Sequence, residues 1–182
     1  MNLIFDIGFN VGEFTQTCFN KYPTCNVIAV EANPNLVNGV SPHFFTNYNF
    51  TLHNNLVSNI EGEEIDFYVS PYATGVSTAS TEFMQNSRFT KGSKNLPENS
   101  IKWNEPIKIQ SITIDSMLER YGMPDLIKID VEGYEYNVLI GLTQKANDIC
   151  FEWHEEESEN LYKILQHLQN IGYTQFGVIG WF

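Results

Sequence analysis

Acidic side chains follow four short apolar runs of the sequence, each of which has the composition of a buried strand. They are found in Asp6-Ile-Gly-Phe-Asn-Val-Gly12, at Glu31, at Asp130 and in Glu152-Trp-His154. Ligands of parallel sheets bind where the carboxyl ends of the strands meet the following loops. Asp6 suits a ligand with an amine or sulfonium charge, and Glu31 can accept hydrogen bonds from both hydroxyls of a ribose. A cationic group near Asp6 and a ribose at Glu31 are both present in S-adenosylmethionine, which is the ligand that the two acids together indicate.

The turn after the first of these runs depends on its glycines. Gly8 and Gly12 allow a tight turn and a close approach of a ligand to the backbone, and Asn10 can cap the helix that follows. Their spacing differs from the Gly-x-Gly-x-x-Gly of dinucleotide sites, and Asp6 would repel a pyrophosphate. An oxidoreductase that binds a nucleotide ribose at Glu31 is therefore a weaker alternative. An ordinary strand-to-helix turn is the alternative without a ligand.

Methyl transfer to a hydroxyl needs a base for the departing proton, and three residues of the predicted rim can supply one. His154 fits best, because an ordinary imidazole titrates near ~6.5, and Asp130 and Glu152 come next. The alternative for His154 is a surface position in the first turn of the last helix. The same three residues could bind a divalent metal that lowers the pKa of the acceptor. Nothing in their spacing requires a metal, and we predict none.

Two of the three charged residues around Asp130 have simpler structural explanations. Glu135 is expected to cap the helix after Gly133 and to complement its dipole. Lys128 is expected to form a salt bridge, and Glu132 remains unassigned.

Hydrophobic periodicity predicts alternating strands and helices. Strands are expected at residues 2–6, 26–31, 48–57, 64–69, 107–114, 125–131 and 148–152, with a last strand or hairpin at 173–182. Helices are expected at residues 10–22, from Pro34, from Asp115, at 135–142 and at 155–171. This rhythm indicates βαβ units. We therefore predict an α/β fold with a doubly wound, mostly parallel sheet in a single domain of residues 1–182.

The segment of residues 70–106 has no clear period and is rich in Ser, Thr, Asn, Gly and Pro. We expect a lid or insertion whose closure would exclude water from a sulfonium. Its basic residues Arg88, Lys91 and Lys94 could bind an anionic acceptor, although a solvated loop is the alternative.

Charge and composition exclude several classes of protein. The formal net charge of −12 argues against a nucleic-acid partner, because counterion release needs a basic face. The sequence has no apolar run of membrane-spanning length and no signal-peptide pattern at its start, so we expect a cytoplasmic protein with no membrane partner. Three cysteines are too few for a disulfide framework. The sequence leaves the oligomeric state open.

Three segments together resemble the FkbM-type family of S-adenosylmethionine-dependent methyltransferases. They are Asp6-Ile-Gly-Phe-Asn-Val-Gly-Glu-Phe-Thr15, Val30-Glu-Ala-Asn-Pro34 and Ile127-Lys-Ile-Asp-Val-Glu-Gly-Tyr-Glu135. The last is the most specific, since many methyltransferases share the first. The resemblance spans roughly residues 2 to 157. It implies a class I (Rossmann-like) fold of seven strands in three α/β/α layers, and O-methylation of a hydroxyl on a small molecule, sugar or glycan.

The resemblance also implies roles for individual residues. The methionine half of the cofactor would lie along Asp6, Gly8, Asn10 and Gly12. Glu31 would hold the ribose, and the adenine would lie near Asn33, Asn55 and Ser58. Asp130 would lie nearest the methyl group. The remaining alternative is a cofactor-binding module with reduced catalysis that needs a partner to complete its acceptor pocket.

Overall fold

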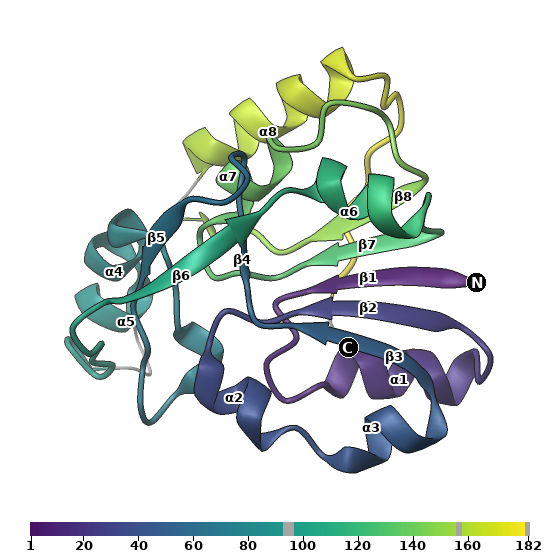
Figure 1. Ribbon diagram of the computed structural model, residues 1–182. Coiled ribbons are helices and arrows are strands. Elements are labelled where there is room, and N and C mark those ends of the chain that lie inside the picture. The colour runs from purple at the N-terminus through teal and green to yellow at the C-terminus, as the bar shows by residue number, and fades with distance from the viewer. Residues whose placement is uncertain (93–96, 156–157, 181–182) are drawn as a thin grey trace.

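Five parallel strands form the central sheet (Figure 1). The computed structural model describes residues 1–92, 97–155 and 158–180, without the side chain of residue 47. The strands of the sheet are β1 (Leu3–Ile7), β2 (Asn26–Val30), β3 (Asn49–His53), β7 (Leu126–Ile129) and β8 (Asp148–Phe151). Their order is β3-β2-β1-β7-β8, with β1 in the centre. The order reverses direction at β1, which is where doubly wound sheets bind their ligands.

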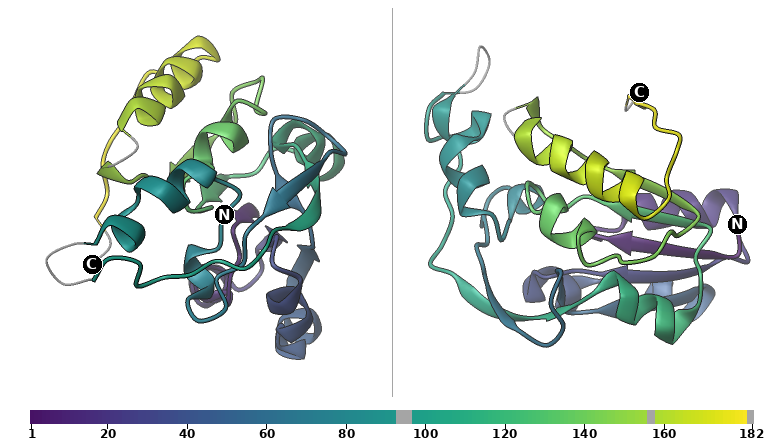
Figure 2. Two further views of the ribbon diagram at one scale, coloured as in Figure 1. Left: turned by 90° about the vertical axis from the view of Figure 1, so that its left-hand side faces the viewer. Right: turned by 90° about the horizontal axis from the view of Figure 1, so that it is seen from above.

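Helices cover both faces of this sheet (Figures 1 and 2). The helices of one side are α1 (Glu13–Lys21), α2 (Pro34–Gly39) and α3 (Pro42–Asn47), and those of the other are α6 (Ile114–Tyr121), α7 (Glu135–Leu139) and α8 (Ser158–Asn170). Phe19 of α1 and Phe44 of α3 pack under one face, whereas Met117, Leu139 and Ile164 pack on the other. The predicted α/β fold with three layers is confirmed.

A small second sheet stands beside the carboxyl ends of the central strands. It consists of β4 (Leu56–Val57), β6 (Ile107–Ile112) and β5 (Glu64–Phe67) in this spatial order. β4 runs parallel to β6, and β5 runs antiparallel to it. The single strand expected at residues 48–57 was therefore wrong. Asn54 and Asn55 separate its two halves, which belong to different sheets.

The segment expected to be a lid contains regular structure. Its helical pieces are η1 (Thr74–Val76), α4 (Thr81–Asn86) and α5 (Arg88–Lys91). Ser80 caps α4, because its hydroxyl accepts a hydrogen bond from the N–H of Phe83. Figure 1 shows α4 and α5 beyond the carboxyl ends of the central strands. Lys94 lies outside the described residues.

The chain after α8 differs from the expected strand or hairpin. Residues 173–180 are irregular as far as the structure describes them. The Tyr173 hydroxyl donates a hydrogen bond to the carbonyl of Ala146 at 2.9 Å, which ties the start of this tail to the loop before β8. The central sheet thus has five strands rather than the seven that the resemblance implied. No helix in the described part of the chain is both long and apolar enough to cross a membrane.

Candidate functional site

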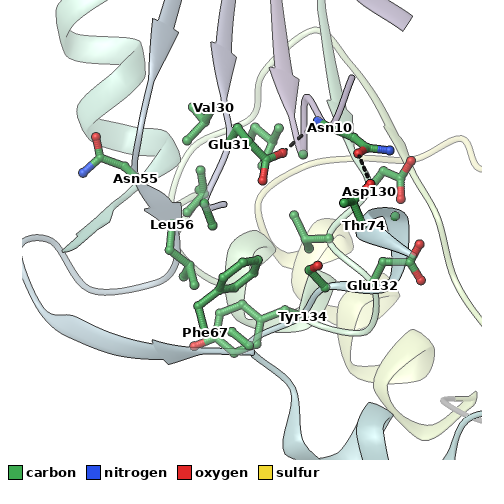
Figure 3. Close-up of a pocket in the computed structure, with 18 residues that line it drawn as sticks. Asn10, Val30, Glu31, Asn55, Leu56, Phe67, Thr74, Asp130, Glu132 and Tyr134 are labelled. Carbon is green, nitrogen blue, oxygen red and sulfur yellow. Dashed lines mark hydrogen bonds between the residues drawn. The ribbon is translucent and has the colours of Figure 1, made fainter. Parts of the chain in front are cut away.

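A cavity opens at the carboxyl ends of β1, β2 and β7, beneath the second sheet (Figure 3). It encloses about 700 Å³ of space, part of which is open to solvent. Its polar lining includes Asn10, Glu31, Asn55, Thr74, Asp130 and Glu132. Its apolar lining includes Val30, Leu56, Val57, Phe67, Ala79 and Tyr134. The cavity therefore offers an apolar end, an acidic end and one carboxylate, that of Glu31, between them.

The turn after β1 is shaped by a close backbone contact. Gly8 has a φ of 82°, and a Cβ there would lie 1.8 Å from the carbonyl oxygen of Asp130. Only glycine permits both features. Asn10 has a φ of 49°, which asparagine tolerates better than most residues, and its side-chain oxygen accepts a hydrogen bond from Thr74 at 3.2 Å. This bond fastens the turn to the lid segment.

The N–H groups of this turn donate to protein acceptors. Those of Gly8 and Phe9 donate to the carbonyl of Val30, at 3.0 and 3.1 Å. The N–H of Asn10 donates to Glu31 at 2.7 Å. A loop that binds a pyrophosphate instead directs such N–H groups at the ligand. This turn is therefore not arranged as a phosphate cradle.

Glu31 is the most tightly positioned acid of the cavity. Its Oε2 accepts the N–H of Asn10 and its Oε1 accepts the N–H of Asn33, each at 2.7 Å. Burial raises the pKa of Glu31, although these two N–H groups and Lys128 act in the opposite direction. Each carboxylate oxygen has a second acceptor position. The side chain can thus accept two more hydrogen bonds from a ligand in the cavity.

The apolar end is built by the second sheet and by the turn after β7. Phe67 of β5 and Tyr134 lie side by side in Figure 3, and Leu56 of β4 lies next to them. Asn55 also lines the cavity, and its amide donates to the carbonyl of Gln110 at 3.0 Å. A flat, mostly apolar ring suits this end of the cavity better than a charged group does.

Asp6 does not line the cavity. Its carboxylate is fully buried, accepts the Thr15 hydroxyl at 2.6 Å and lies 3.2 Å from the ammonium of Lys128. Lys128 also lies 3.5 Å from Asp130 and donates to the carbonyl of Gly8 at 2.7 Å. Asp6 therefore forms a buried ion pair that holds the glycine turn against β7, and its side chain does not face the cavity. The expected salt bridge of Lys128 is confirmed.

Three other predicted contacts also lie outside the lining. Gly12 begins α1 with a φ of 86°, and a Cβ there would lie 2.5 Å from the ring of Phe9, so it faces the core. Asn33 is buried and its side chain caps α2 through the N–H of Asn35. The Ser58 hydroxyl is buried and donates to the side chain of the next residue at 3.2 Å. Asn33 acts on the cavity through its N–H, which positions Glu31.

The acidic end has a partly buried cluster behind it. Asp130 and Glu132 line the cavity, whereas Glu152 and His154 lie next to them outside the lining. The Nε2 of His154 is 3.5 Å from Glu132 and 3.9 Å from Glu152. The imidazole is 9% exposed and packs against the ring of Phe83, so the surface position considered for it was wrong.

The charges in this cluster influence one another. The Glu132 carboxylate raises the pKa of His154 to about 9 against the effect of burial. Burial, followed by the neighbouring Asp130, raises the pKa of Glu152 to about 7. The imidazole therefore holds its proton at neutral pH. Since a general base must be unprotonated, this geometry lends no support to the prediction that His154 is the base.

Glu132 is held in an unusual backbone conformation. Its φ is 53°, and that of Gly133 is 86°. The Glu135 carboxylate accepts the N–H groups of Val131 and Gly133, each at 3.0 Å, and the Thr78 hydroxyl donates to the carbonyl of Glu132 at 2.7 Å. Glu135 thus fixes the turn before α7, close to its expected capping role. Strained residues of this kind are concentrated at functional sites.

Several lining residues were not predicted from the sequence, and three of them, Phe67, Thr74 and Tyr134, shape the cavity most directly. Tyr134 directly follows the strand end at Asp130-Val-Glu-Gly133, so the rule that placed Asp130 at the rim could have found it. Phe67 and Thr74 come from the second sheet and from the lid segment. No pattern in the sequence places these two elements over the rim.

Comparison with family models gives one match. The model described as the methyltransferase FkbM domain matches residues 6–174, which is nearly the whole chain. Comparison with curated proteins found no match, and comparison with solved structures found none either.

Proposed function

Because this chain belongs to the FkbM methyltransferase family, and is therefore a methyltransferase, we propose that it uses S-adenosylmethionine to methylate a hydroxyl group of a small molecule or glycan. The observation that carries the proposal is the arrangement of the cavity in Figure 3, where Glu31 lies between Leu56 on the apolar side and Asp130 on the acidic side. An adenine, a ribose and a cationic amino-acid group occur in S-adenosylmethionine in the same order.

The lining residues fit each part of this cofactor. Phe67 and Tyr134 would contact the adenine, because aromatic rings pack well against flat ring systems. Glu31 would accept the ribose hydroxyls through its two remaining acceptor positions. Asn10 and Asp130, at the other end, would contact the amino-acid part and its positive charge.

A dinucleotide fits this site poorly. The N–H groups of Gly8, Phe9 and Asn10 are used within the protein, so they are not available to a pyrophosphate. Asp130 and Glu132 would place negative charge beside it. These observations favour the sulfonium cofactor over the redox alternative.

The chain would contribute positioning, exclusion of water and removal of a proton. When bound, S-adenosylmethionine supplies an electrophilic methyl group for an in-line displacement. Asp130 lines the cavity, unlike Glu152 and His154, and is thus the best placed of the three predicted catalytic residues to take the proton of the acceptor hydroxyl. The lid segment, fastened by Thr74 and Thr78, would exclude water.

Calorimetric titration with S-adenosylhomocysteine, with NAD as the control, tests the cofactor. We expect micromolar binding of S-adenosylhomocysteine and no binding of NAD, because Glu31 offers acceptors whereas the N–H groups of Gly8, Phe9 and Asn10 are already used within the protein. Transfer of labelled methyl groups to a panel of hydroxyl acceptors then tests the reaction. Binding of NAD alone would overturn the proposal in favour of redox chemistry. Binding of S-adenosylhomocysteine without transfer to any acceptor would support the cofactor-binding module.

Binding of S-adenosylhomocysteine should also depend on pH through Glu31. The pKa of this carboxyl is raised by burial, so acidification protonates it earlier than an ordinary glutamic acid. The carboxylate form, which accepts ribose hydroxyls, is present above this pKa and is lost as the pH falls through it. We therefore expect affinity to fall as the pH is lowered from neutrality. In a Glu31→Gln variant the affinity should no longer fall with pH for this reason. An identical pH profile in the two proteins would contradict the assignment of Glu31 to the ribose.

A further inference from the structure

The cluster behind the acidic end of the cavity contains two buried atoms that the proposed cofactor does not use. Among the described residues, the Oε2 of Glu132 and the Nε2 of His154 have no hydrogen-bond partner. The distance of 3.5 Å between them is too long for a good hydrogen bond. Buried polar atoms are nearly always satisfied. The Nε2 of an imidazole that is 91% buried thus has only two carboxylates at ion-pair distances of 3.5 and 3.9 Å, and no hydrogen bond among the described residues, which needs an explanation.

We propose that Glu132, Glu152 and His154 bind a divalent metal ion. One ligand atom from each residue lies within 4.8 Å of the other two. An ion at about 2.1 Å from each atom would separate neighbouring ligands by about 3 Å. The three ligand atoms would therefore have to move closer together by on the order of 1 Å when the ion binds. Glu132 and Glu152 are carried by the turns after β7 and β8, which are adjacent parallel strands.

The charge around the cluster also favours a cation. Burial, followed by the neighbouring Asp130, raises the pKa of Glu152, so a third carboxylate adjoins the two that lie nearest the imidazole. Lys128 is 3.5 Å from Asp130, but it also neutralises the buried Asp6. Arg88 lowers the pKa of Glu132, but burial, His154 and Asp130 influence it more. A divalent ion would supply the positive charge that these acids require.

The type of ligand indicates the type of ion. Carboxylate oxygens suit Mg²⁺, Ca²⁺ and Mn²⁺, whereas imidazole suits first-row transition metals. Two carboxylates with one imidazole therefore favour Mn²⁺ or a similar ion. From the sequence, Asp130, Glu152 and His154 were potential ligands and no metal was predicted. The structure brings Glu132 to 3.5 Å from His154, and Glu132 therefore replaces Asp130 in the ligand set.

The place of the ion suggests its role. Glu132 also lines the cavity, so open coordination positions would face the acidic end. A metal at this place can bind an acceptor oxygen and lower the pKa of its hydroxyl. This role rests on the proposed function, whereas binding of the ion does not.

Titration of the chelator-treated protein with Mn²⁺ tests the site, read out by calorimetry and by the paramagnetic signal of free Mn²⁺. Because the ion competes with a proton for His154, the titration is made at a pH of about 8. We expect one tight Mn²⁺ site in the wild-type protein. Glu152→Gln and His154→Asn should each weaken it at least tenfold, since even residues that only orient ligands change affinity by about 10- to 100-fold. The exposed neighbour Glu155 provides the matched control, Glu155→Gln, which should bind Mn²⁺ as the wild type does.

A titration of every variant with S-adenosylhomocysteine separates this proposal from the proposed function. Neither Glu152 nor His154 lines the cavity, so both variants should keep their affinity for this probe and thereby show that they are folded. Absence of Mn²⁺ binding in a protein that binds S-adenosylhomocysteine would overturn the metal site alone. Equal Mn²⁺ affinity in the wild type and both variants would also overturn it. Mn²⁺ binding without S-adenosylhomocysteine binding would support the metal site and contradict the proposed cofactor.

Discussion

Replacing Glu31 with glutamine is expected to weaken S-adenosylhomocysteine binding at least about 100-fold. Two hydrogen bonds from ribose hydroxyls to a carboxylate contribute about 1.5–3 kcal/mol each, which together correspond to about 100-fold or more in affinity. Glutamine also cannot replace both carboxylate oxygens. They accept the N–H groups of Asn10 and Asn33, so the amide nitrogen of glutamine would face one of these donors. Calorimetric titration of the variant measures the loss.

Two controls identify the cause of such a loss. Glu119→Gln removes the same charge from the exposed surface of α6 and should bind S-adenosylhomocysteine as the wild type does. Near-native thermal unfolding of the Glu31 variant would show that its fold persists. An affinity within a few-fold of the wild-type value would refute the assignment of Glu31 to the ribose.

Replacing Lys128 with methionine is expected to lower the free energy of unfolding by about 3–5 kcal/mol, as is usual when one partner of a buried ion pair is removed. Asp6 is fully buried 3.2 Å from this ammonium and would be left without its counter-charge. The carbonyl of Gly8 would also lose its donor. Urea unfolding of the variant and the wild type measures the change.

Two further measurements show whether the unpaired Asp6 causes this loss of stability. Burial already raises the pKa of Asp6, and removal of Lys128 would raise it further. A folded-state pKa above that of the unfolded chain makes stability fall as the pH rises, so the deficit should be greater at neutral pH than at acidic pH. A second substitution, Asp6→Asn, should recover much of the loss. Lys108→Met breaks an exposed ion pair with Asp66 and should change stability far less. Equal losses in the two lysine variants would contradict the explanation.

The central sheet could be predicted because its strands carry a local pattern. The segments around Phe5, Ile28 and Ile127 are short apolar runs followed by turns, as expected for strands covered on both faces. The second sheet could not be predicted in this way. Its pairing joins β4 and β5 to β6, about 50 residues further along the chain. Such pairing depends on tertiary contacts, and the hydrophobic periodicity of a short segment carries no information about them.

The acidic lining residues Glu31 and Asp130 could be predicted from the sequence, whereas the lining residues Phe67 and Thr74, from the second sheet and the lid segment, could not. The strand-end rule identified Gly8, Asn10, Glu31 and Asp130, which all line the cavity. Asp6 does not line the cavity, and the sequence carries a signal for its position. Side chains alternate along a strand, so Asp6 shares the α1 face with Ile4, where Thr15 meets it.

The pairing of β1 with β7 also determines when the site can form during synthesis. Ile4 pairs with Leu126, and Ile7 pairs with Ile129, so β1 leaves the ribosome more than 100 residues before the strand with which it pairs. Contacts between such distant segments slow folding. Until β7 emerges, β1 has a free edge, and Gly8 has no Asp130 carbonyl to pack against. A nascent chain that stops before residue 126 therefore carries Glu31 and the glycine turn without the β7 side of the cavity, and it exposes apolar strand edges that favour aggregation.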